Sequence, residues 1–190
     1  MNESVYEKIT ALQSEIAKKR KEIEALREQA ELEPVNDYTF KDWDGNEVTL
    51  SSLFGSSDEL MVIHNMGKRC VYCTLWADGL NGFAGHLNSR APFVVVSPDA
   101  PEVQQEFAES RGWQFKMVSG KESPFTHDMG FEPEPGTYWP GVSTFVKKDG
   151  KIYRKAHDIF GPGDSYCSVW HLFDLLPNKI KWEPKYSYNS

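Results

Sequence analysis

No stretch of apolar residues in this 190-residue chain approaches the roughly 20 residues that a transmembrane helix needs. The first residues, Met1 to Ser4, lead into a charged segment and lack the apolar core of a secretory signal peptide. The sequence therefore predicts neither a membrane protein nor an exported one, and the cytoplasm is the expected location.

Net positive charge is also lacking, because 21 Lys and Arg residues face 28 Asp and Glu residues, for a net charge of -7. Proteins that bind nucleic-acid duplexes usually present a basic face. The basic cluster at residues 18–21 is surrounded by Glu15, Glu22 and Glu24, which predicts a solvated helix face with ion pairs between neighbouring turns. Nucleic acid is therefore not an expected partner.

Cysteine is scarce, with three residues in the chain. A secreted disulfide scaffold would be denser in cysteine, and in a reducing compartment paired cysteines are more often redox-active or metal-binding than structural. Two of the three, Cys70 and Cys73, enclose only Val71 and Tyr72. This spacing closes a small disulfide at the start of a helix, and it also forms half of many zinc sites.

Glycine and proline are absent from residues 5–30, which we predict to form one long helix. Apolar residues recur along it in alternating steps of four and three, with Lys19 in place of one of them, as in the seam of a coiled coil. The members of this seam are Val5, Ile9, Leu12, Ile16, Ile23, Leu26 and Ala30. Such a seam packs either on the chain's own globular part or on a second chain, so a homodimer through this helix is one of two expectations.

Pro34 ends this helical arm, because proline disrupts helices. We therefore divide the chain into a helical arm (1–33), a globular domain (34–182) and a C-terminal tail (183–190). With 39% hydrophobic residues, the chain has enough apolar surface for one hydrophobic core.

Strands and helices alternate in the globular part. A hairpin around Asp44-Gly45 comes first. The other predicted elements are an apolar strand (60–64), a helix (70–87), a strand (93–96), a helix (101–111), a strand (115–118), a long loop (124–141), a second hairpin (143–147 and 152–155) and a final helix (165–176) capped by Asp164 and stopped by Pro177. A β-α-β unit followed by a hairpin and a helix is the thioredoxin arrangement. The fold class is therefore expected to be α/β, a thioredoxin-like fold with an N-terminal β-hairpin elaboration and a long N-terminal helix.

An ordered set of short motifs runs along the chain. These motifs are Asp37-Tyr38-Thr39-Phe40, Asp44-Gly45, Cys70-Val71-Tyr72-Cys73, Trp76-Ala77-Asp78-Gly79, Arg111-Gly112-Trp113 and Pro140-Gly141-Val142-Ser143. In them the sequence resembles a thioredoxin-like family of unknown function, whose members are commonly labelled predicted dithiol–disulfide oxidoreductases. The resemblance implies a thioredoxin fold and a redox role. In thioredoxin proper a cis-proline precedes the strand beside the disulfide; here Val142 stands at that position, two residues after Pro140.

The Cys-x-x-Cys pair carries the predicted chemistry. The thiolate is the attacking species, and unpaired backbone N–H groups at a helix N-terminus favour it at Cys70. Lys68 and Arg69 add positive charge nearby. Cys70 is therefore predicted to attack a disulfide, and Cys73, one turn later, to resolve the mixed disulfide. The expected partners are protein or small-molecule thiols and disulfides, and no bound cofactor is expected.

A zinc site is an alternative interpretation. Cys167 and His171 lie four residues apart on the predicted final helix and so share one face. Together with Cys70 and Cys73 they would make a four-ligand set of accepted types. The apolar residues beside Cys167 and His171 favour core packing for this pair instead.

Two further functions stay open. Peroxiredoxins use one activated cysteine with a Thr and a Pro just before it, and residues 66–69 supply neither, so a peroxidase is less favoured. In a non-catalytic interaction protein, the fold would be a scaffold, the arm would mediate dimerisation, and the cysteines would be structural or bind metal.

Three aromatic neighbours of the cysteines have two interpretations each. His64, at the end of a predicted strand, serves either as a proton shuttle or as a hydrogen-bonded strand-end residue, and the second is favoured. Trp76 and Tyr72 could line a docking surface for a partner, but core packing is favoured for Trp76.

Overall fold

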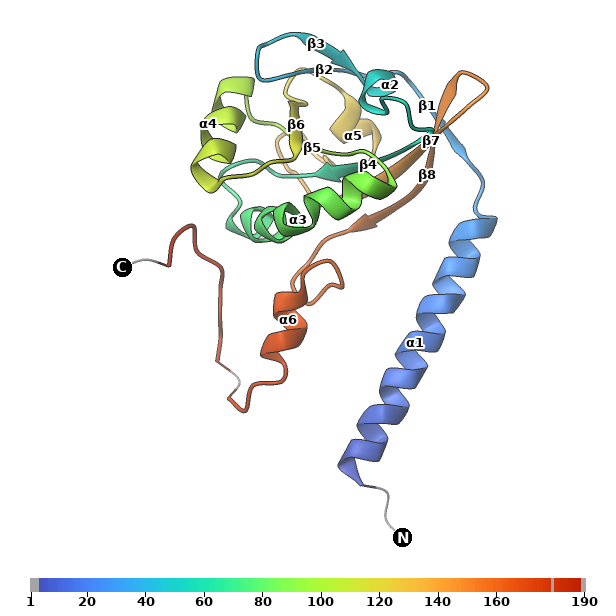
Figure 1. The fold of residues 1–190 in the computed structure, drawn as a ribbon, viewed down its shortest axis with the longest axis vertical. Coiled ribbons are helices and arrows are strands. Elements are labelled where there is room, and N and C mark those ends of the chain that lie inside the picture. The colour runs from blue at the N-terminus through green and yellow to red at the C-terminus, as the bar shows by residue number, and fades with distance from the viewer. Residues whose placement is uncertain (1–3, 179, 189–190) are drawn as a thin grey trace.

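The computed structural model describes residues 4–178 and 180–188 (Figure 1). In chain order its elements are α1 (Val5–Gln29), β1 (Glu33–Val35), β2 (Thr39–Lys41), β3 (Glu47–Thr49), α2 (Leu50–Leu53), β4 (Glu59–His64), α3 (Val71–Arg90), β5 (Phe93–Ser97), α4 (Pro101–Arg111), β6 (Lys116–Ser119), α5 (Phe125–Asp128), β7 (Gly141–Lys148), β8 (Lys151–Ile159) and α6 (Ser168–Phe173). Within the described ranges, no helix is both long and apolar enough to span a bilayer.

The strands of this described part form an eight-stranded mixed sheet in the order β1-β8-β7-β4-β5-β6-β2-β3. β4, β5 and β6 are parallel neighbours, and the helices α3 and α4 connect them as β-α-β units. The hairpins at either side pair antiparallel with this central unit. β4 therefore lies in the middle of the sheet, and the loop that follows it leads directly into α3.

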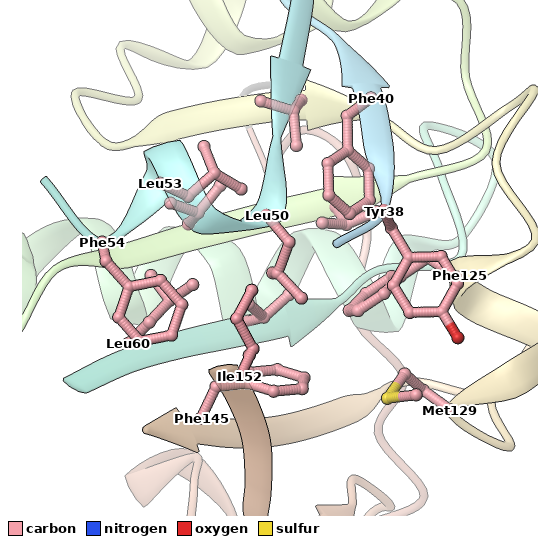
Figure 2. Close-up of a cluster of buried hydrophobic side chains, with 14 of the residues drawn as sticks. Tyr38, Phe40, Leu50, Leu53, Phe54, Leu60, Phe125, Met129, Phe145 and Ile152 are labelled. Carbon is pink, nitrogen blue, oxygen red and sulfur yellow. The ribbon is translucent and has the colours of Figure 1, made fainter. Parts of the chain in front are cut away.

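Side chains along β4 alternate between two cores on opposite faces of the sheet. Leu60 and Val62 belong to a core rich in aromatic rings, which Figure 2 shows with Phe40, Phe125 and Phe145. Ile63 faces the second core. That core lies against α3 and α4 and includes Trp76, Ala77, Ala108, Trp113 and Phe115.

Most predicted elements are confirmed, and the differences lie at short or late segments. The predicted final helix (165–176) is wrong in extent, because α6 spans only Ser168–Phe173. Asp164 does not cap it: its carboxylate accepts the N–H groups of Tyr166 and Cys167 at 2.9 and 3.1 Å and forms a turn before the helix. The predicted loop 124–141 contains the short helix α5, and its last residue opens β7.

The arm is a helix as predicted, and none of its residues from Val5 to Gln29 is buried. Ser4 and Glu7 form a reciprocal capping box at its N-terminus. Polar contacts join its C-terminal half to the domain: Arg27 donates to Asp158 at 2.8 Å, and Arg20 donates to Ser165 at 3.0 Å. Figure 1 shows α1 running away from the sheet, so that its N-terminal end stands clear of both cores.

Candidate active site

Cys70 occupies the N-cap of α3, at the end of the loop that leaves β4. Its backbone is extended, with φ -96° and ψ 103°, and its Sγ accepts the backbone N–H of Cys73 at 3.0 Å. A side-chain acceptor at the N-cap satisfies one of the free donors in the first helical turn. The thiol of Cys70 therefore takes the place that a Ser or Asp side chain has in most helices.

The loop before Cys70 is held by Asp99, which follows β5, and by Asn65 of the loop itself. Lys68 donates its backbone N–H to the Asp99 carboxylate at 2.6 Å, and Gly67 donates its own to the Asn65 side chain at 2.8 Å. Gly67 has φ +93°, and a Cβ there would lie 2.8 Å from an Asp99 carboxylate oxygen. Both facts require glycine at this position. Sequence reasoning missed Asn65 and Asp99, because their role depends on a tertiary contact.

The pKa of the Cys70 thiol is lowered to about 7. The largest cause is a hydrogen bond from the Cys73 thiol, and the backbone N–H groups of Cys73 and Tyr72 add to it, while partial burial opposes them. The charges of Lys68 and Arg69, which were predicted to lower this pKa, are not among its main causes. Hydrogen bonds at the helix start, rather than neighbouring basic side chains, favour the thiolate.

Cys73 has the opposite environment. Only 2% of its surface is exposed, whereas Cys70 is half-buried. Its hydrogen bond to Cys70 raises the pKa of the Cys73 thiol, and burial and the nearby negative charge raise it further. One cysteine is accessible and readily ionised, and the other is shielded and protonated. The sequence predicts the greater exposure of Cys70, and the structure agrees with it.

A small cavity lies beside Cys73, and its lining includes Asn65, Trp76, Pro140 and Phe160. Pro140 precedes Gly141, the first residue of β7, which pairs with His64 of β4. Val142 pairs instead with Ile63, one step further along β7. Pro140 therefore lines the same cavity as Cys73, whereas Val142, the position that alignment to thioredoxin suggests, does not.

His64 is buried and its Nε2 lies 2.9 Å from the Ser143 hydroxyl. The ring stacks on Phe131 at 3.7 Å and on Phe125 at 5.4 Å, both members of the core on the face away from α3. Burial lowers the pKa of His64 to about 3. A neutral, stacked histidine supports the interpretation as a hydrogen-bonded strand-end residue and gives no support to a proton shuttle.

Trp76 is 4% exposed and joins the core below α3, as predicted. Tyr72 is partly buried and packs against Trp76 and Trp170, with ring centroids 6.3 and 6.2 Å apart. The C-terminal tail lies close to the cysteines: Tyr186 packs on Phe107 of α4, and burial together with the charges of both cysteines raises the pKa of its hydroxyl.

The four predicted zinc ligands are not brought together. In the part of the chain that the structure describes, no group of three His, Cys, Asp or Glu side chains is arranged to hold a metal ion. Cys167 is buried in the core with Trp76 and Phe160, and burial raises the pKa of its thiol. His171 is exposed on α6. The zinc set is therefore wrong for the described residues, because His171 is exposed on α6 while Cys167 is buried in the core.

A family described as "Bacterial protein of unknown function (DUF899)" matches residues 5–185. The chain belongs to this family. Among curated proteins no match is found for this DUF899 chain.

Solved structures show its fold. The mitochondrial 2-Cys peroxiredoxin of Plasmodium falciparum is similar, with a TM-score of 0.56 and 12% identity, over 75% of this chain and 90% of that one. The peroxidoxin BcpB of Mycobacterium tuberculosis has a TM-score of 0.53 and 23% identity, over 72% and 88%. The peroxiredoxin-like protein of Aquifex aeolicus has a TM-score of 0.53 and 18% identity, over 67% and 74%. The predicted fold class is confirmed: this DUF899 chain has a thioredoxin-like fold with an N-terminal hairpin and a long N-terminal helix.

The hydrogen bonds at Cys70 lead to a prediction about pH. The rate of Cys70 alkylation by iodoacetamide should rise with a midpoint near pH 7, because the thiolate reacts and the pKa of Cys70 is about 7. Cys73→Ala removes the donor that lowers this pKa most, so the midpoint should move upward. Cys73→Ser keeps a hydroxyl donor and should move it less. Peptide mass spectrometry at each pH measures the rates, and identical midpoints for both variants would contradict the assigned cause.

Proposed function

We propose that this protein is a thiol–disulfide oxidoreductase that uses Cys70 as nucleophile and Cys73 as resolving thiol. The observation that carries the proposal is the Cys70 sulfur at the start of α3, which accepts the Cys73 N–H at 3.0 Å and has a pKa lowered to about 7. At neutral pH roughly half of the Cys70 thiol is then ionised, whereas an ordinary cysteine is mostly protonated. A thiolate that is partly accessible and has a second thiol one turn away is suited to two-step exchange.

In the first step the Cys70 thiolate attacks one sulfur of a substrate disulfide. A bond forms between Cys70 and that sulfur, the substrate S–S bond breaks, and the other substrate sulfur leaves as a thiolate and takes a proton from water. Because a good leaving thiol has a low pKa, substrates of that kind should react fastest.

In the second step Cys73 attacks the Cys70 sulfur of the mixed disulfide. Once Cys70 is in a disulfide its negative charge is gone, and with it two of the three causes that raise the pKa of Cys73. The Cys73 proton passes to solvent and the remaining substrate thiolate leaves. The enzyme ends as a Cys70–Cys73 disulfide with two electrons removed, and an external thiol or dithiol restores it.

Peroxide reduction is the second candidate, since the similar structures include peroxiredoxins. It is supported by the fold alone, because residues 66–69 bring neither Thr nor Pro before Cys70. Consumption of hydrogen peroxide that requires Cys70 and a thiol donor would favour this candidate over disulfide exchange.

A redox titration tests the proposal directly. The protein is equilibrated in glutathione buffers, alkylated, and analysed by mass spectrometry. The Cys70–Cys73 peptide should lose two hydrogens reversibly, with a midpoint between roughly -120 and -270 mV, the range of known exchange catalysts. Cys167 serves as internal control, because its thiol is buried with a raised pKa and should remain free. If the pair never forms an internal disulfide, the cysteines are structural and the interaction-protein alternative takes precedence.

A further inference from the structure

An apolar stripe on α1 is left uncovered by the other residues that the structure describes. The exposed fractions of its side chains are 43% for Ile9, 58% for Leu12, 54% for Ile16, 48% for Ile23 and 66% for Leu26. A helix of 25 residues is about 37 Å long, and most helices gain their stability by packing an apolar face. The seam was expected to pack either on the chain's own globular domain or on a second chain, and the described part of the domain does not cover it. The stripe therefore needs a partner from outside the chain.

The order of residues in the stripe matches one type of coiled coil. In heptad notation Ile9, Ile16 and Ile23 fall at position a, and Leu12 and Leu26 fall at position d. Branched residues at a combined with Leu at d favour parallel dimers over trimers and tetramers. Among parallel coiled coils the stripe thus selects two strands.

Charges beside the stripe favour the parallel direction of the two helices. Glu15 and Glu22 fall at position g, and Arg20 and Arg27 fall at position e. In a parallel pair, a g residue meets the e residue five positions later on the other helix, so Glu15 faces Arg20 and Glu22 faces Arg27. An antiparallel pair places g against g and e against e, which brings like charges together.

We propose that two copies of this chain associate through α1 as a parallel two-stranded coiled coil, with both globular domains at the same end. This interface does not depend on the redox proposal. The contacts of Arg27 with Asp158 and Arg20 with Ser165 are solvent-exposed and therefore weak, so both arginines can turn to the glutamates of the second copy. Figure 1 shows the N-terminal half of α1 extending away from the sheet.

Lys19 occupies the d position between Leu12 and Leu26 and pairs with Glu22 of its own helix at 2.7 Å. A polar residue at one core position lowers the stability of a coiled coil and fixes its register. In a parallel homodimer the two Lys19 side chains would meet. Lys19→Leu should therefore strengthen association, whereas on a helix with no partner it would leave the mass in solution unchanged.

The first test is the mass in solution of the full chain, measured by light scattering and sedimentation over a range of concentrations. The wild type should reach twice the chain mass. Ile16→Glu, at an a position, should shift the protein to monomer, and Ala17→Glu, one residue further and on the outer face, should leave the dimer intact. A wild type that stays monomeric at its highest soluble concentration would overturn the proposal, as would a dimer that Ile16→Glu leaves unchanged.

Charge reversal tests the direction of the helices. A variant with both glutamates changed to Arg (Glu15→Arg, Glu22→Arg) and a variant with both arginines changed to Glu (Arg20→Glu, Arg27→Glu) should each dimerise more weakly than the wild type at low salt. Mixed in equal amounts, the two variants should form a heterodimer, and salt should reduce the difference. Circular dichroism confirms that each variant keeps its helix content. Two variants that dimerise as tightly as the wild type at low salt would overturn the parallel pairing.

Discussion

Replacing Cys70 with serine is expected to reduce disulfide exchange to the uncatalysed rate, whereas Cys73→Ser is expected to trap mixed disulfides. Cys70 is the accessible thiol with the lowered pKa, and a serine hydroxyl does not ionise at neutral pH. Without the Cys73 thiol the first attack still takes place, but no second thiol releases the substrate. Cys70→Ser should therefore form no mixed disulfide, whereas Cys73→Ser should accumulate one, although both variants lose turnover.

Two measurements separate these outcomes. Turnover is followed as release of a chromophoric thiol from a small aromatic disulfide in the presence of a reductant. Trapped adducts are counted by mass spectrometry after incubation with oxidised glutathione: Cys73→Ser should carry one glutathione on Cys70, and Cys70→Ser none. Cys167→Ser is the matched control, since that thiol is buried with a raised pKa and should not take part. Full reductase activity in Cys70→Ser would refute the assignment of the nucleophile.

The site could be predicted from sequence as far as local structure determines it. The apolar run before the loop forms β4, and the helical spacing after Cys70 forms α3, so the cysteine pair falls at a strand–loop–helix junction. The N-cap position of Cys70 and its exposure relative to Cys73 follow from that junction alone. These features depend on residues close in sequence, which explains why one amino-acid sequence was enough to predict them.

Tertiary contacts made the rest unpredictable. Asp99 holds the loop through the N–H of Lys68, 31 positions earlier. Pro140 lines the cavity of Cys73 because β7 pairs beside β4. The wrong zinc prediction also comes from unseen tertiary contacts. The spacing of Cys167 and His171 suits a metal site, but the packing of α6 buries Cys167 and leaves His171 exposed. β1 has only three residues and no strand pattern in its sequence, so its formation depends on its pairing with β8.

The strand that brings Pro140 to the cysteines leads to a prediction about stability. Gly141→Ala is expected to destabilise the protein strongly, because a Cβ at this position would lie 2.3 Å from the Asp158 carbonyl oxygen and 2.3 Å from a ring carbon of Phe131. Neither neighbour can easily give way. The carbonyl belongs to β8, paired with β7, and Phe131 is stacked on buried His64. Overpacking of this kind costs about 1–3 kcal/mol and occasionally more.

Gly82→Ala is the matched control for this substitution. Gly82 lies exposed in α3, with nothing within 4 Å of an added Cβ, so alanine there should stabilise the helix by about 0.5–1 kcal/mol. Urea unfolding should give a lower midpoint for Gly141→Ala and a higher one for Gly82→Ala, with unchanged slopes. An unaltered midpoint for Gly141→Ala would mean that β7 and β8 do not approach as closely as the structure has them.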